Sequence, residues 1–137
     1  MADRCFASRS ACGTPETGNE PVVGLDLIEI ERLEAALERR PRLAERVFHP
    51  AELRFAEQRK RPGRHLAARF AAKEAALKAL GLGGLGLRDV EVSGGGDRAP
   101  QLRLHGRAAE EAERLGVELS LSLTHSRELA AAVVVAR

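Results

Sequence analysis

The chain has 137 residues, 44% of them hydrophobic and 31% charged, and a formal net charge of +2. This length corresponds to one domain and these proportions are ordinary for a globular protein, which excludes separate cofactor and substrate domains and a wholly disordered chain. The sequence has no Trp or Tyr and only four Phe, which argues against a stacking platform for single-stranded nucleic acid.

The first 21 residues mix polar and charged residues with Gly and Pro and show no periodicity. They predict a disordered extension at 1–21 before one domain at 22–137. Both cysteines, Cys5 and Cys12, lie in this extension, so no disulfide framework is expected and a cytoplasmic location fits. We find no apolar run of the kind that forms a signal peptide or a membrane span, and we expect no membrane association.

The first ordered element is expected at 22–28, where a β-favouring run has apolar residues on both faces, as a central strand does. Helical periodicity follows at 29–40, with another turn or two between Leu43 and Phe48. Further helices are expected from about 51 to 60 and from about 64 to 80, and prolines and glycines mark the breaks between them.

The last third of the chain alternates between strand and helix patterns. Two short strands about a Gly-rich turn, a polar amphipathic helix and two more strands are expected at 90–92, 101–105, 106–115, 117–124 and 129–135. The order of elements predicts an α+β fold: a single domain with a small, mainly antiparallel sheet packed on a long buried helix.

Basic residues are concentrated between Arg39 and Arg64. That segment has nine basic and three acidic residues, a balance of nine minus three, or +6. One interpretation is a solvated helical face. The other is a surface for an acidic partner such as a nucleic acid, an anionic membrane, a phosphorylated ligand or an acidic protein.

The helix expected at 64–80 is apolar nearly all round between Leu66 and Leu80, a pattern typical of a buried helix. Glu74 borders the large apolar side chains of its core-facing stripe. An ionised carboxylate in such a place needs a cation. Lys78 has the i,i+4 spacing of a simple surface ion pair, which is one explanation.

Asp26 is the second unusual carboxylate, because Asp is depleted in strands and this one has apolar neighbours. It either caps a nearby helix or joins Glu74 in holding a divalent cation. Mg²⁺ often takes one or two protein carboxylates and completes its shell with waters and phosphate oxygens. Lys78 would then bind a phosphoryl oxygen. The glycines from Gly81 to Gly86 are weak evidence for a phosphate loop, since the end of a helix explains them.

His125 ends an alternating strand on the face shared by its leucines. A hydrogen-bonded core histidine is the usual explanation, and a polar strand end at a cleft is the other. The spacing of Cys and His residues matches no zinc motif.

Four motifs occur in a specific order. They are Val23-Gly24-Leu25-Asp26-Leu27-Ile28-Glu29-Ile30 followed by Arg32; Phe48-His49-Pro50-Ala51-Glu52-Leu53; Arg69-Phe70-Ala71-Ala72-Lys73-Glu74-Ala75 with Lys78-Ala79-Leu80-Gly81; and Ser120-Leu121-Ser122-Leu123-Thr124-His125-Ser126. In these motifs residues 22–137 resemble the holo-[acyl-carrier-protein] synthases, the small single-domain 4′-phosphopantetheinyl transferases.

The resemblance implies transfer of the 4′-phosphopantetheine group from coenzyme A to a serine of an apo acyl carrier protein, with release of 3′,5′-ADP. It implies that Asp26 and Glu74 hold Mg²⁺ and act in catalysis with Lys78. The coenzyme site that it implies is lined by Arg69, Lys73, Lys78, Gly81, Gly83, Thr124 and His125. Gly81-Leu82-Gly83-Gly84 departs from the commoner Gly-Thr-Gly of the family, so the phosphate contacts of that loop are not carried over in detail.

The resemblance also implies docking of the acidic carrier protein by Arg32 and the arginines after it, Arg39, Arg40 and Arg42. Larger relatives build their site between two halves of one chain, so a chain with one copy is expected to form a homotrimer with its sites at subunit interfaces. Two alternatives remain: a non-catalytic basic module that binds nucleic acid or an acidic protein, and a transferase relative without activity.

Overall fold

The computed structural model describes residues 20–84 and 86–137. The expected extension therefore falls almost entirely outside the described residues. The elements, in chain order, are β1 (Val22–Glu29), α1 (Ile30–Arg39), α2 (Leu43–Val47), α3 (Pro50–Glu57), α4 (Pro62–Ala79), η1 (Leu87–Asp89), β2 (Val90–Gly95), β3 (Arg98–Leu104), α5 (Gly106–Leu115), β4 (Leu119–His125) and β5 (Leu129–Ala136).

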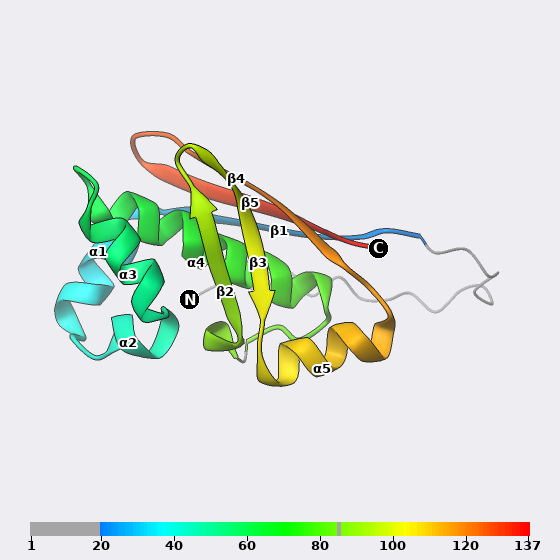
Figure 1. The fold of residues 1–137 in the computed structure, drawn as a ribbon. Coiled ribbons are helices and arrows are strands. Elements are labelled where there is room, and N and C mark those ends of the chain that lie inside the picture. Colours follow the sequence, from blue (N-terminus) through cyan, green and yellow to red (C-terminus); the bar gives the residue numbers. More distant parts are fainter. Residues whose placement is uncertain (1–19, 85) are drawn as a thin grey trace.

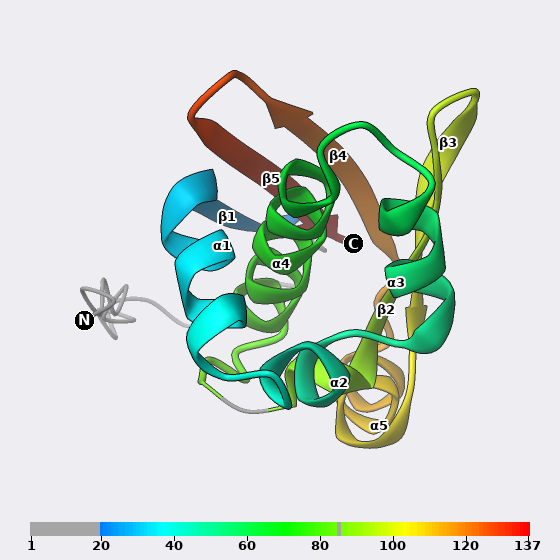
Figure 2. The same ribbon diagram turned by 90° about the vertical axis from the view of Figure 1, so that its left-hand side faces the viewer.

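The long helix α4 is the centre of the fold. A three-stranded antiparallel sheet, in the order β1-β5-β4, packs on one side of it, while α1, α3 and the β2-β3 hairpin lie around the rest (Figures 1 and 2). Most of α4 from Leu66 to Ala79 is buried, as its nearly continuous apolar sequence predicted. The expected α+β domain with antiparallel strands on a long buried helix is confirmed, and the hairpin is a separate two-stranded sheet.

Small residues let β1 and α4 approach closely. A Cβ atom on Gly24 would lie 1.8 Å from the carbonyl oxygen of Ala75, a separation that no side chain tolerates. The five alanines Ala67, Ala71, Ala72, Ala75 and Ala76 of α4 have no exposed surface. This contact brings the face of β1 that carries Gly24 and Asp26 onto the helix.

One expectation about β1 was wrong. Among the described residues it is an edge strand, not a central one, and it pairs with β5 alone. The side chains of Val23, Leu25 and Leu27 point away from α4 and are 59%, 62% and 62% exposed. Within a single chain, only the face of β1 that packs on α4 is buried. The apolar residues of the other face form a surface patch.

The other elements differ from expectation mainly at their ends. The helix expected at 51–60 begins at Pro50 and stops at Glu57, and α4 begins two residues early at Pro62, where proline suits the first helical turn. Gly116, with a φ of 66°, ends α5 where expected. No helix in the described ranges is both long and apolar enough to cross a membrane.

Candidate functional site

Asp26 and Lys78 meet where β1 crosses the second half of α4. The ammonium of Lys78 lies 3.0 Å from Oδ1 of Asp26 and also donates to the carbonyl oxygen of Leu25 at 3.0 Å. The Asp26 side chain is 17% exposed and that of Lys78 is 45% exposed. Burial raises the pKa of Asp26, and the hydrogen bond and charge of Lys78 partly oppose this rise.

Glu74 lies near this pair, one helical turn before Lys78. Its pKa is raised first by burial and then by the negative charge of Asp26, and the charge of Lys78 lowers it in part. No ion pair joins Glu74 to Lys78 in the described part of the chain. The i,i+4 surface pair considered from the sequence is therefore not formed, because the lysine reaches across to the strand.

This set of side chains suits a divalent cation. Two partly buried carboxylates repel each other, and one lysine cannot fully neutralise both. Carboxylate oxygens are the protein ligands that Mg²⁺ prefers, and an ion here would relieve both the burial cost and the repulsion. The carboxylate of Asp26 accepts a hydrogen bond from the side chain of Lys78, so the alternative that Asp26 caps a helix is wrong.

His125 lies at a different place along α4. Its exposed ring makes an edge contact with His65, at 5.7 Å between ring centroids, and His65 in turn contacts Phe55 at 5.9 Å. His65 is nine residues before Glu74 on α4, a separation of about 13 Å along the helix axis. Within one chain, the structure thus joins Asp26, Glu74 and Lys78 but leaves His125 apart from them.

A family model described as the 4′-phosphopantetheinyl transferase superfamily matches residues 22–134. The chain is 50% identical over 113 residues to the holo-[acyl-carrier-protein] synthase of Moorella thermoacetica, which covers 80% of this chain and 88% of the relative. The chain belongs to the holo-[acyl-carrier-protein] synthase family of 4′-phosphopantetheinyl transferases.

Solved structures of this family share the fold. The Helicobacter pylori holo-[acyl-carrier-protein] synthase in complex with coenzyme A has a TM-score of 0.71 and 30% identity, covering 84% of this chain and 99% of that chain. The Chronobacterium ammoniagenes ACPS-CoA complex has a TM-score of 0.75 and 32% identity, covering 86% and 97%. The family resemblance seen in the four motifs is therefore confirmed.

Two residues of the family's Lys-Glu-Ala segment are buried and do not reach the Asp26–Glu74 surface. Lys73 has no exposed side-chain surface and pairs with Glu52 at 2.8 Å. Arg69 is 2% exposed, stacks on Phe55 with its guanidinium carbon 3.8 Å from the ring centroid, and donates to the carbonyl of Gly94 at 2.7 Å. Both side chains make their contacts inside this chain, and we therefore propose structural roles for them in place of the coenzyme contacts expected from the resemblance.

Glu52 is a residue for which the sequence predicted no role, although it stands in the second motif. The residue is 1% exposed, and its carboxylate accepts hydrogen bonds from the backbone N–H groups of His49 at 2.7 Å and Val92 at 2.9 Å. Together with Lys73, it joins the start of α3 to α4 and β2. The available signal is its position three residues after His49, the residue that directly precedes the helix, which is where a Glu completes a capping box.

The remaining predicted residues lie at the surface. Gly81, Gly83 and Thr124 are exposed, the first two in the loop after α4 and the third near the end of β4. The four arginines expected to dock a partner, Arg32, Arg39, Arg40 and Arg42, are exposed on and just after α1. Arg40 and Arg42 line a shallow surface hollow together with Pro41, Leu43 and Arg46. These arginines are therefore exposed to solvent, in agreement with the interpretation of the basic segment as a solvated face.

Proposed function

We propose that this chain transfers 4′-phosphopantetheine from coenzyme A to a serine hydroxyl of an apo acyl carrier protein, releasing 3′,5′-ADP. The single observation that carries the proposal is the convergence of Asp26, Glu74 and Lys78 in a member of this family. A relative of the same fold was solved with coenzyme A, which supports coenzyme A as the co-substrate.

We infer that Asp26 and Glu74 hold Mg²⁺ against the diphosphate of coenzyme A. The ion, when bound, would neutralise charge on the diphosphate oxygens. Lys78 binds a phosphoryl oxygen and orients the diphosphate, and its charge favours the ionised form of Asp26 against the effect of burial. The serine oxygen forms the new bond to phosphorus as the bond between phosphorus and the oxygen of 3′,5′-ADP breaks, and the serine proton passes to solvent. No covalent bond to the protein is required, since phosphoryl transfer depends mainly on alignment and charge neutralisation.

A homotrimer with its sites between subunits is part of the proposal. Two features of the single chain support it. The apolar outer face of β1, formed by Val23, Leu25 and Leu27, is uncovered, and patches of this kind mark interaction surfaces. His125 contacts His65, which lies about 13 Å along α4 from Glu74, so we infer that a neighbouring chain is needed for His125 and Thr124 to line the same coenzyme.

The basic surface around α1 is proposed to dock the carrier protein. Arg32, Arg39, Arg40 and Arg42 are exposed and no ion pair holds their side chains in the described ranges. Unpaired arginines on one surface attract an acidic protein and raise its association rate. Because both cysteines precede residue 22 in the sequence and no disulfide framework is expected, a cytoplasmic location stays our prediction.

Mass spectrometry tests the proposed activity. An apo acyl carrier protein incubated with this chain, coenzyme A and Mg²⁺ should gain the mass of one phosphopantetheine group, and a carrier with its acceptor serine changed to alanine should gain none. An unchanged carrier mass would overturn the proposal. Salt-sensitive retention on nucleic acid, without binding of coenzyme A, would instead support the non-catalytic basic module.

A further inference from the structure

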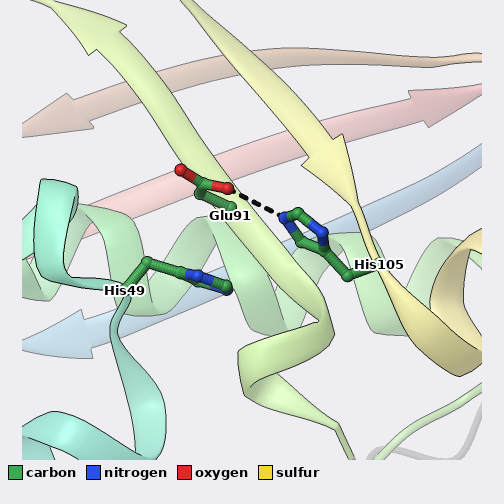
Figure 3. Close-up of side chains that lie close together, drawn as sticks. All are labelled: His49, Glu91 and His105. Atoms are coloured by element: carbon green, nitrogen blue, oxygen red, sulfur yellow. Dashed lines mark hydrogen bonds and ion pairs between the residues drawn. The ribbon is translucent and has the colours of Figure 1, made fainter.

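A second group of possible metal ligands lies at the other side of α4, where α3 begins beside the open end of the β2-β3 hairpin. His49 directly precedes α3, Glu91 lies in β2, and His105 joins β3 to α5. One ring nitrogen of each histidine and one carboxylate oxygen of Glu91 all lie within 4.8 Å of one another. Figure 3 shows the three side chains converging from three separate segments.

Contacts within the group already bring donor atoms together. Nε2 of His105 lies 2.8 Å from Oε2 of Glu91, and the rings of His49 and His105 stack with centroids 5.0 Å apart. Nε2 of His49 lies 2.6 Å from the carbonyl oxygen of Arg88. Because a carbonyl only accepts, Nε2 carries a proton, and Nδ1 is the ring nitrogen left to bind an ion. Metal-binding histidines commonly donate their other N–H to a carbonyl in this way.

The backbone around the three residues is held in place. The N–H of His49 donates to the buried carboxylate of Glu52 at 2.7 Å. The N–H of His105 donates to the carbonyl of Asp89 at 2.7 Å. Glu91 stands opposite Arg103 in the β2-β3 ladder. Because the backbone is fixed at all three residues, less conformational entropy is lost when their side chains bind an ion.

We propose that His49, Glu91 and His105 form a binding site for a transition-metal ion of the Zn²⁺ class, independent of the Asp26–Glu74 site. Two imidazoles and one carboxylate, with a fourth position for water, are a donor set that Zn²⁺ takes. Mg²⁺ prefers oxygen ligands alone. No hydrogen bond or ion pair among the described residues joins these three side chains to Asp26, Glu74 or Lys78.

The spacing requires only small side-chain movements. With metal–ligand distances of about 2.1 Å, tetrahedral donors lie about 3.4 Å apart. The His105–Glu91 pair at 2.8 Å must open slightly, and a pair at the upper limit of 4.8 Å must close by about 1.4 Å, which side-chain torsions can supply. The ion takes the place of the proton between Nε2 of His105 and Oε2 of Glu91, and that proton passes to buffer.

The proposed ligands lie close to the protein surface. The Glu91 side chain is 13% exposed and that of His105 is 40% exposed, so an ion can enter from solvent. A bound ion would clamp the start of α3 to the hairpin and to the start of α5.

Calorimetric titration of the full chain with Zn²⁺, in excess Mg²⁺, tests the site. Cys5→Ser and Cys12→Ser are included in every sample because thiolates also bind zinc. We expect one Zn²⁺ per chain and a thermal unfolding midpoint that rises with zinc concentration. Glu91→Gln and His105→Asn should each lower the zinc affinity at least tenfold. Arg103→Gln should raise it, by less than about tenfold, because it removes a repelling charge.

Two controls separate the site from other ligands. His65→Asn removes a histidine of the other histidine pair and should leave zinc affinity unchanged. Glu74→Gln should also leave it unchanged, so failure of the Mg²⁺ site and failure of the zinc site are distinguishable. Equal zinc affinity in the starting chain and in both Glu91→Gln and His105→Asn would overturn the proposal, and so would loss of binding in His65→Asn.

Discussion

The ammonium of Lys78 lies 3.0 Å from Oδ1 of Asp26, a residue 52 positions earlier, and forms no ion pair with Glu74, one turn back on its own helix. One lysine thus opposes the effect of burial on two carboxyl groups, since its charge lowers the pKa of both. Glu74 remains without a directly bonded cation in the described part of the chain, which is the arrangement expected where a metal ion completes the site.

Changing Lys78 to Gln should shift the pH dependence of the reaction. Loss of the lysine charge raises the pKa of Asp26 and Glu74 further, so the ionised carboxylates needed to hold a cation appear only at higher pH. The acid limb of the pH–activity profile should move to higher pH, and turnover should fall roughly a hundredfold. Lys78→Arg keeps the charge and should leave the acid limb in place. An unshifted acid limb in Lys78→Gln would refute the role of this lysine.

The buried pair Lys73–Glu52 should matter for stability rather than for coenzyme binding. Neither side chain has exposed surface, and removing one partner leaves an uncompensated buried charge. Lys73→Met should lower the free energy of unfolding by about 3–5 kcal/mol in urea denaturation, and combining it with Glu52→Gln should recover part of that loss. A stable Lys73→Met chain with a raised KM for coenzyme A would contradict this assignment.

The exposed face of β1 should control assembly. Leu25→Glu places a charge in the centre of the apolar patch and should convert the proposed trimer to monomers in sedimentation velocity, with loss of activity as the subunits separate. Leu115→Glu makes the same change at a leucine that is 40% exposed on α5 and should leave assembly intact. The trimer proposal would be wrong if the unaltered chain sedimented as a monomer.

Charge reversal on α1 should affect the carrier protein more than coenzyme A. Arg32→Glu combined with Arg39→Glu should raise the KM for the carrier protein about tenfold or more at low salt and that for coenzyme A little, because the lost charges act on association. Arg107→Glu lies in the first turn of α5, where a negative charge is tolerated, and serves as the control. Equal rises in both KM values would count against docking at α1.

The sequence predicted local structure well because local rules determine it. The helix at 106–115 was expected with the bounds that the structure has, because an amphipathic period and a terminal glycine define it. The edge position of β1 was missed, since apolar residues on both faces indicate burial without saying whether this chain or another copy provides it.

Pairing between distant residues was harder to predict. Spacing indicated a Glu74–Lys78 pair, but the close approach of β1 at Gly24 brings Asp26 within reach of the lysine instead. The burial of Lys73 depends on Glu52, 21 positions earlier, and no periodicity connects two such residues. The group of His49, Glu91 and His105 was missed for the same reason, as it comes together only when the hairpin meets α3.

The central claim is that Asp26 and Glu74 together hold the catalytic cation, and Glu74→Gln tests it most directly. Burial and the charge of Asp26 raise the pKa of Glu74 in the folded chain. Without a metal ion, ionisation of Glu74 therefore lowers the free energy of unfolding as pH rises toward that pKa. We predict that at pH 7.5 the variant unfolds at the same temperature or a few degrees higher, by about 1–4 °C. Transfer to the carrier protein should fall at least a thousandfold at every Mg²⁺ concentration. Undiminished Mg²⁺-dependent transfer by this variant would contradict the account.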